Sequence, residues 1–115
     1  MSSVYVEREI YCRQDGAWEK GLISVHQPYQ DTEFDPKGET WRCDIAIQWP
    51  GFSCRKRHLG SDSYQALELA FRLVPSLIAA TDEFRGRNLA LHEGKAVLDS
   101  TSIREFFHAR LPGDV

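Results

Sequence analysis

The fold is decided at residues 57–71, which read RHLGSDSYQALELAF. Before Gly60, apolar residues recur at every second position, which is typical of a β-strand with one buried face. After Gly60 they recur at every third or fourth position, as in an amphipathic helix, and Ser61 or Asp62 can cap its first turn. The sequence therefore predicts an α+β domain in which a long helix over residues 62–80 covers one face of a sheet.

The sheet is expected to occupy residues 3–59 as a four-stranded antiparallel meander. Its clearest strand spans residues 41–49, where large apolar side chains occupy every second position. Tight turns are predicted at Asp15-Gly16 and Pro50-Gly51, because glycine accepts the positive φ that such turns need. Residues 28–39 are rich in proline, glycine and acidic side chains, which predicts a long loop. A loop of this length in a small domain is often functional.

The apolar stripe of the predicted helix is expected to pack against the sheet, since a helix with so wide an apolar face is not stable alone. Pro75 lies inside the pattern and predicts a kink or a break near residues 71–74. The members of the stripe are Tyr64, Leu67, Phe71, Val74 and Ile78.

Residues 86–115 are expected to form a C-terminal extension of the same single domain. Residues 86–100 fit either a small hairpin or an irregular connector. Ser102 and Glu105 have the spacing of a capping box, which predicts a short final helix over residues 103–111.

Length and composition limit the function classes. The chain has 115 residues, of which 42% are hydrophobic and 27% charged, as in an ordinary globular domain. Its formal net charge of −3 argues against a protein that coats nucleic acid. Neither a secretory signal nor a membrane-spanning apolar run is evident, so we expect a cytoplasmic protein without membrane contact. The three cysteines, Cys12, Cys43 and Cys54, lack C-x-x-C spacing, which favours free thiols.

The junction between sheet and helix also carries a family resemblance. The pattern G-x-D-S-x-Q-A-L-x-L-A begins at Gly60, downstream of a W-x-C strand at Trp41 and Cys43. These features resemble a family of small uncharacterised bacterial proteins, and the resemblance covers about residues 20–80. It implies a bacterial, soluble, single-domain protein. No catalytic role comes with it, because the family carries no established activity.

The sequence gives little support for a metal site or for a catalytic site. A two-residue turn at Pro50-Gly51 would place Cys43 opposite His58 and Cys54 opposite Ile47, and one cysteine–histidine couple falls short of the four ligands of zinc. We therefore expect no metal and no other cofactor. Cys54, His58 and Asp44 form the only nucleophile, base and acid on neighbouring strands, but residues four apart on a strand lie too far apart to share a proton. No catalytic motif is present, so no enzymatic activity is expected.

Aromatic and charged side chains in the turns favour protein binding instead. Exposed aromatic residues with arginine nearby are typical of interface hot spots. A plainer interpretation is that the aromatic rings fold back over the open face of the sheet. The candidate partner-binding residues are Tyr29, Asp31, Glu33, Phe34, Asp35, Trp49, Phe52, Arg55 and Arg57.

The expected function is a non-enzymatic protein-binding module, for example an immunity-type or adaptor protein. Its partner is another protein, and a homodimer is the other arrangement to consider. The alternative is a nucleic-acid-associated accessory protein that uses the basic strand around Arg55 and Arg57. Alternation sends Arg55 and Arg57 to one face and Lys56 to the other, which divides the basic patch. Charges on such a strand also protect an exposed sheet edge from aggregation.

Overall fold

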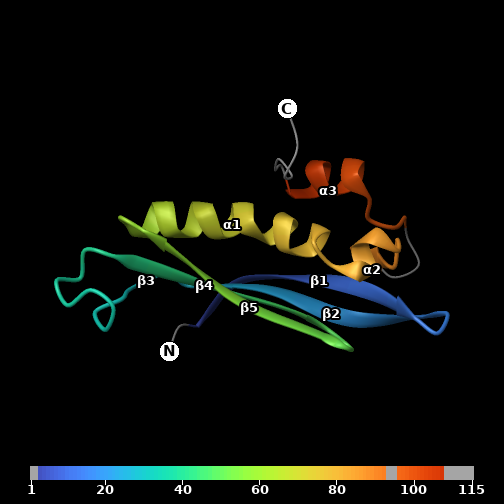
Figure 1. Cartoon of the computed structure of the whole chain (residues 1–115), viewed down its shortest axis with the longest axis horizontal. Coiled ribbons are helices and arrows are strands. Elements are labelled where there is room, and N and C mark those ends of the chain that lie inside the picture. Colours follow the sequence, from blue (N-terminus) through green and yellow to red (C-terminus); the bar gives the residue numbers. More distant parts are fainter. Residues whose placement is uncertain (1–2, 93–95, 108–115) are drawn as a thin grey trace.

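In the residues that the computed structural model describes, 3–92 and 96–107, all helices lie on one face of an antiparallel sheet (Figure 1). The opposite face is not covered by any described element. Among these residues, no helix has both the length and the apolar character needed to cross a membrane. The elements are β1 (Val4–Gln14), β2 (Ala17–His26), β3 (Tyr29–Gln30), β4 (Trp41–Trp49), β5 (Phe52–Gly60), α1 (Ser63–Ala79), α2 (Asp82–Arg85), β6 (Leu89–Ala90) and α3 (Ser100–Phe107).

The predicted meander is present, in the order β1-β2-β4-β5, but the sheet has six strands rather than four. β3 lies inside the predicted loop and pairs with Trp41 and Arg42 of β4. β6 pairs with Tyr11 and Cys12 of β1. Strands of two residues are too short to produce a periodic signal. β3 is therefore not predicted, and β6 is foreseen only by the hairpin alternative for residues 86–100.

The β4–β5 hairpin has the register that its two-residue turn predicts. Trp49 pairs with Phe52, and Gly51 at the turn has a φ of +89°, a conformation that favours glycine. Further along the hairpin Cys43 lies opposite His58, and Cys54 lies opposite Ile47, as expected. β5 pairs only with β4, so its basic side chains occupy an edge of the described sheet.

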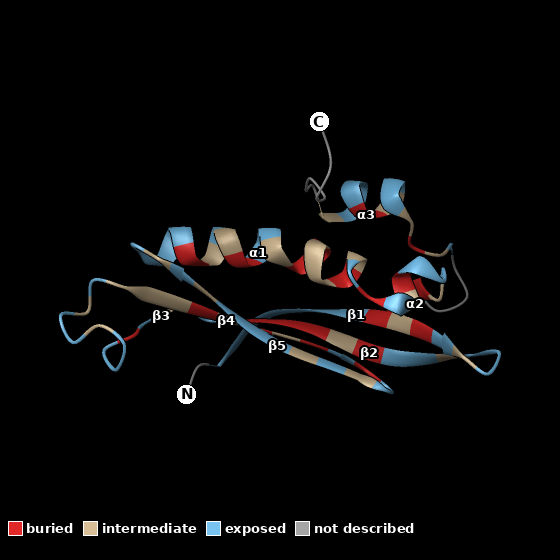
Figure 2. Cartoon of the chain, in the orientation of Figure 1, coloured by how far each residue is buried: buried red, intermediate tan, exposed pale blue. Residues whose placement is uncertain are grey.

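The core lies between α1 and the sheet (Figure 2). The helix approaches closely, because small residues face the strands and because Gly60 carries no side chain. The predicted orientation of the helix is therefore partly wrong, since Tyr64 is 75% exposed and Phe71 is 42% exposed. The residues of α1 that are buried are Ala66, Ala70, Val74, Pro75 and Ile78.

The start of α1 is capped as predicted. The Asp62 carboxylate accepts a hydrogen bond of 2.7 Å from the Gln65 backbone N–H. The Gln65 side-chain oxygen in turn accepts a bond of 2.8 Å from the Ser61 N–H. The break expected near residues 71–74 is absent, because the helix continues to Ala79 with Pro75 buried. Burial of the proline ring offsets the lost hydrogen bond. The kink stays a prediction.

The C-terminal helix begins earlier than predicted, at Ser100 rather than at residue 103. The reason is its cap, which is Asp99 and not Ser102. The Asp99 carboxylate accepts hydrogen bonds from the backbone N–H groups of Thr101 and Ser102, at 3.0 and 2.9 Å. The end predicted at residue 111 lies outside the described residues. Before this helix, an antiparallel bridge joins Ala90 to Val97, which supports the hairpin alternative for residues 86–100.

Candidate protein-binding surfaces

Residues 31–40, here called the Phe34 loop, are fixed to the sheet by Asp31. Its side chain is buried, and its carboxylate accepts a bond of 3.0 Å from the Phe34 N–H. The guanidinium of Arg42 on β4 lies 3.4 Å from the other carboxylate oxygen. The Phe34 N–H, followed by Arg42, lowers the pKa of Asp31. The carboxylate thus ties the loop to the sheet as an anion.

Asp35 holds the second half of the Phe34 loop. Its carboxylate accepts from the backbone N–H groups of Lys37 and Glu39, at 3.2 and 3.1 Å, and from the Thr40 hydroxyl at 3.1 Å. The base of the loop is closed by the Asp31 N–H, which donates to the Thr40 carbonyl at 2.9 Å. Residues without regular structure are therefore held in one shape by their own hydrogen bonds.

This fixed loop presents an aromatic side chain to solvent. Phe34 is 67% exposed, and the neighbouring Glu33 is also exposed. A large apolar group on a preformed loop can bind a partner without first being ordered. Phe34 is one of the candidate partner-binding residues, and that role stays a prediction; the structure shows that its ring is exposed.

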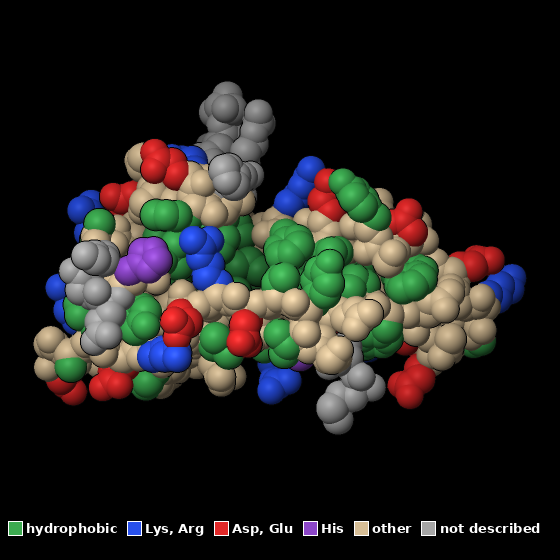
Figure 3. All heavy atoms as spheres, turned by 180° about the vertical axis from the view of Figure 1, so that it is seen from behind, with side chains coloured by type: hydrophobic (Ala, Val, Ile, Leu, Met, Phe, Trp, Pro, Cys, Tyr) green, Lys and Arg blue, Asp and Glu red, His purple; other side chains and the backbone are tan. Residues whose placement is uncertain are grey.

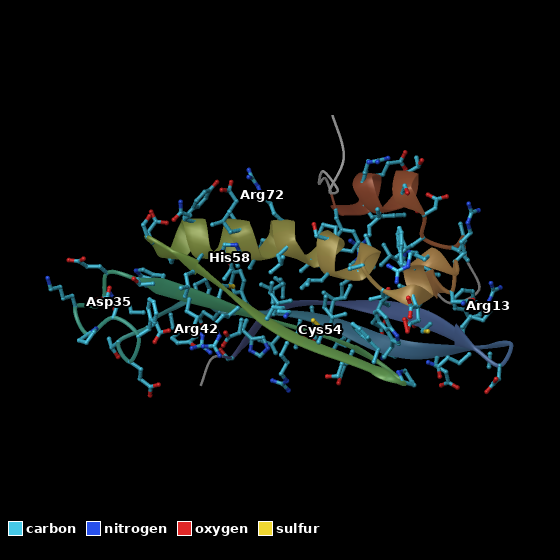
Figure 4. All side chains as sticks on the ribbon, viewed as in Figure 1. Arg13, Asp35, Arg42, Cys54, His58 and Arg72 are labelled. Carbon is cyan, nitrogen blue, oxygen red and sulfur yellow. The ribbon has the colours of Figure 1, made fainter. Side chains whose placement is uncertain are left out.

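The uncovered face of the sheet has a polar hollow of about 400 Å³ beside the loop. Arg42, which is labelled in Figure 4, is one of the residues that line it. The Arg42 Nε donates to Asp44 at 3.0 Å, and its guanidinium lies over the Tyr29 ring, 5.6 Å from the centroid. The Tyr29 hydroxyl donates to Asp44 at 3.4 Å. Burial, and then the Asp44 charge, raise the pKa of Tyr29.

Two of the predicted arginines line this same hollow. Arg55 lies opposite Ala46, and Arg57 lies opposite Asp44, so both share the uncovered face with Arg42. Lys56 lies opposite the buried Ile45, as alternation predicts. The structure thus brings four predicted site residues together beside the loop, namely Tyr29, Asp31, Arg55 and Arg57.

Trp49 and Phe52, two further predicted site residues, do not line this hollow. Trp49 is only 4% exposed and stacks on Phe52, with ring centroids 4.3 Å apart and planes at 17°. The expectation of an exposed Trp49 is wrong, because the alternation of β4 places it on the same face as the buried Ile47. This pair closes the core at the far end of the β4–β5 hairpin and contributes packing.

The residues considered for catalysis are separated by the sheet. Cys54 and His58 lie opposite Ile47 and Cys43, on the face that α1 covers, whereas Asp44 lies opposite Arg57 on the uncovered face. Among the described residues, no three histidine, cysteine or acidic side chains come together as a metal site. Burial raises the pKa of Cys43 to about 11, which keeps this thiol protonated.

A third surface was missed at the sequence level. An apolar groove of about 390 Å³ lies between β1 and the helices α1 and α3. In Figure 3, hydrophobic side chains form a band between the helical layer and the edge of the sheet. The apolar residues that line the groove are Val6, Ile23, Val25, Phe71, Val74, Phe106 and Phe107. The signal in the sequence is the helical stripe through Phe71, but such a stripe predicts a buried face rather than a groove.

These features define a small α+β protein with one helical layer, an uncovered sheet face and exposed aromatic side chains at its margins. Residues 6–100 match the family model described as Domain of unknown function (DUF6968), and the chain belongs to this family. The family description assigns no activity. No curated protein and no solved structure matches the chain.

Proposed function

We propose that the chain is a non-enzymatic, cytoplasmic protein-binding module of the adaptor or immunity type, and that the Phe34 loop docks its partner. The observation that carries this proposal is an aromatic side chain, 67% exposed, on a loop whose carboxylates are bonded to its own backbone. Aromatic anchors dominate the binding energy of many protein interfaces. Preorganisation reduces the entropy lost on binding.

The charges near the loop describe the partner. Glu33 lies beside Phe34, while Arg55 and Arg57 border the hollow next to the loop. A complementary partner has an apolar pocket for Phe34, a basic group near Glu33, and an acidic group that reaches Arg55 and Arg57. The negative charge of Glu33 and the positive charges of Arg55 and Arg57 together fix the orientation of the bound partner.

A nucleic-acid-associated accessory role is the second candidate. It is favoured by the position of Arg55 and Arg57 on one face beside the Tyr29 ring, which suits a phosphate next to a stacked base. The carboxylates of Asp31 and Asp44 in the same area oppose it, since they repel phosphate.

Photo-crosslinking from the loop distinguishes the two roles. The analogue p-benzoylphenylalanine replaces Phe34, and in a matched control it replaces Arg72, an exposed residue on the outer side of α1 (Figure 4). In lysate of the native host, we expect a discrete protein adduct from position 34 that position 72 does not give. Reversal of the charges at Arg55 and Arg57 should weaken it. A nuclease-sensitive adduct supports the second candidate, and equal labelling from both positions rejects the loop as a docking site.

A further inference from the structure

We propose that the groove beside β1 binds an extended segment of another protein, which joins the sheet as a strand and alternates large apolar with basic side chains. This site is separate from the Phe34 loop. It combines an unpaired strand edge, an uncovered apolar surface and a fixed pattern of charge.

The unpaired edge is the first half of β1. On its outer side β1 pairs with β6 only at Tyr11 and Cys12, and no described strand pairs with the outer side of residues 4–10. The backbone N–H and C=O groups there can bond to an added chain, as in other cases of strand addition. A bulge between Val4 and Val6 leaves residues 6–10 as the regular part of this edge.

Apolar side chains stand directly above this edge. Phe71 and Phe106 are 42% and 44% exposed, and Val6 on the strand itself is 40% exposed. All three line the same groove. Helical periodicity predicts that Phe71 is buried, yet the described residues leave 42% of it exposed. Apolar surface of this kind, next to unpaired backbone, is typical of a peptide-binding groove.

The wall of the groove is held in place by Arg8. Its guanidinium lies over the rings of Phe106 and Phe107, 5.6 and 5.3 Å from their centroids. The same side chain donates to the Phe106 carbonyl at 3.3 Å. Arg8 is therefore occupied in fixing α3 beside the strand.

The charges on β1 determine which side chains the bound segment carries on its face away from the helices. Alternation places Glu7 and Glu9 on the face of β1 away from the helices, opposite Ser24 and Leu22. Glu9 pairs with Lys20 at 2.5 Å, whereas Glu7 forms no ion pair with any residue that the structure describes. An added strand thus meets apolar groups on its helix side and a carboxylate on its other side.

The same charges disfavour a second copy of this chain. Antiparallel pairing of residues 6–10 with themselves is centred on Arg8. It would place Arg8 opposite Arg8 and Glu7 opposite Glu9, and like charges directly opposite are destabilising. Pairing centred further toward the N-terminus meets the bulge between Val4 and Val6.

The probe is a short, fluorescein-labelled peptide in which lysine alternates with valine and leucine, titrated with the full chain and followed by fluorescence anisotropy. We expect saturable binding. Two control peptides identify its cause: glutamate in place of lysine tests the charge, and N-methylation of alternate backbone nitrogens removes the strand hydrogen bonds. Either change should weaken binding about tenfold or more. Equal binding of the N-methylated peptide overturns strand addition, and absence of saturable binding overturns the site.

Variants of the chain test whether the peptide binds in the groove. Phe71→Asp and Glu7→Lys should each weaken binding about tenfold, and both residues are exposed enough for the fold to persist. Leu59→Asp is the matched control, because Leu59 is 37% exposed on the opposite edge strand. Phe34→Ser should leave binding unchanged, which separates this site from the loop. The proposal is wrong if Phe71→Asp binds the peptide as tightly as the unaltered chain. It is also wrong if the substitution leaves peptide binding unchanged and its one effect is to convert a dimer of this chain to a monomer.

Discussion

Gly60 lies directly against the backbone of Ala66: a Cβ atom built on Gly60 would be 2.5 Å from the Ala66 nitrogen and 2.9 Å from its Cα. The end of β5 and the first turn of α1 are therefore packed backbone to backbone. This contact sets the height of the helix above the sheet. It explains why the helix turns its alanines inward and its larger Tyr64 and Phe71 outward.

The first prediction follows from this contact. Gly60→Ala should lower the free energy of unfolding by about 1–3 kcal/mol, since the neighbouring atoms are backbone and cannot rotate away. Urea denaturation measures the change. Ser53→Ala, an exposed position on the same strand, should change stability by less than about 0.5 kcal/mol. Equal stability of the two variants would show that the helix moves easily relative to the sheet.

The second prediction concerns acid stability. The folded-state pKa of Asp31 is lowered by the Phe34 N–H and by Arg42. The anion therefore stabilises the fold above the unfolded-state pKa of about 4, and this contribution is lost as the pH falls through the folded-state pKa. Asp31→Asn should unfold at lower urea than the unaltered chain at neutral pH, and the gap should close in acid. Glu33→Gln, the same change at an exposed position of the loop, should have little effect. A gap that does not vary with pH would contradict this account.

The third prediction concerns the thiols. Cys12 and Cys43 are buried, and burial raises the pKa of both, whereas Cys54 is partly exposed. Iodoacetamide should modify Cys54 first in the native protein, and should reach the other two only after denaturant is added. Peptide mass spectrometry identifies the modified residue. Modification of Cys43 before Cys54 without denaturant would show that the β4–β5 hairpin opens readily.

The fourth prediction separates packing from recognition. Phe52→Ala should lower stability by about 2 kcal/mol, because it removes a ring stacked on the buried Trp49. Phe34→Ala should change stability by less than about 0.5 kcal/mol, because its ring is in solvent. Thermal unfolding followed by Trp fluorescence compares the two. A large effect of Phe34→Ala would make this residue structural and weaken the proposed docking role.

Much of the fold follows from the spacing of apolar residues. The alternation through residues 41–49 predicts β4, its buried face and, with the turn at Pro50-Gly51, the pairing of Cys43 with His58. The change of period at Gly60 predicts α1 and its Asp62 cap. These features are local, so neighbouring residues alone determine them.

What the sequence did not predict depends on distant contacts. The larger apolar residues on α1 suggested a buried stripe through Tyr64 and Phe71, but Gly60 and the small Ala66 and Ala70 allow a closer approach on another face. The predicted site residues lie in two separate places, beside the Phe34 loop and against the core, for a similar reason. Proximity to a turn suggested that Trp49 is exposed, while its register on β4 directs it into the core. The edge groove could not be predicted, because it forms where Phe106 of α3 meets Arg8 of β1, two residues that are 98 positions apart in the sequence.

The Phe34 loop separates two kinds of position along one short segment. Asp31, Asp35 and Thr40 make the bonds that give the segment its shape. Glu33 and Phe34 are exposed and take no side-chain part in those bonds. Glu33 and Phe34 can therefore be replaced without disturbing the hydrogen bonds that shape the loop. Under the proposed docking role, a few substitutions in this segment would therefore be enough to change the partner, and the rest of the protein could stay as it is.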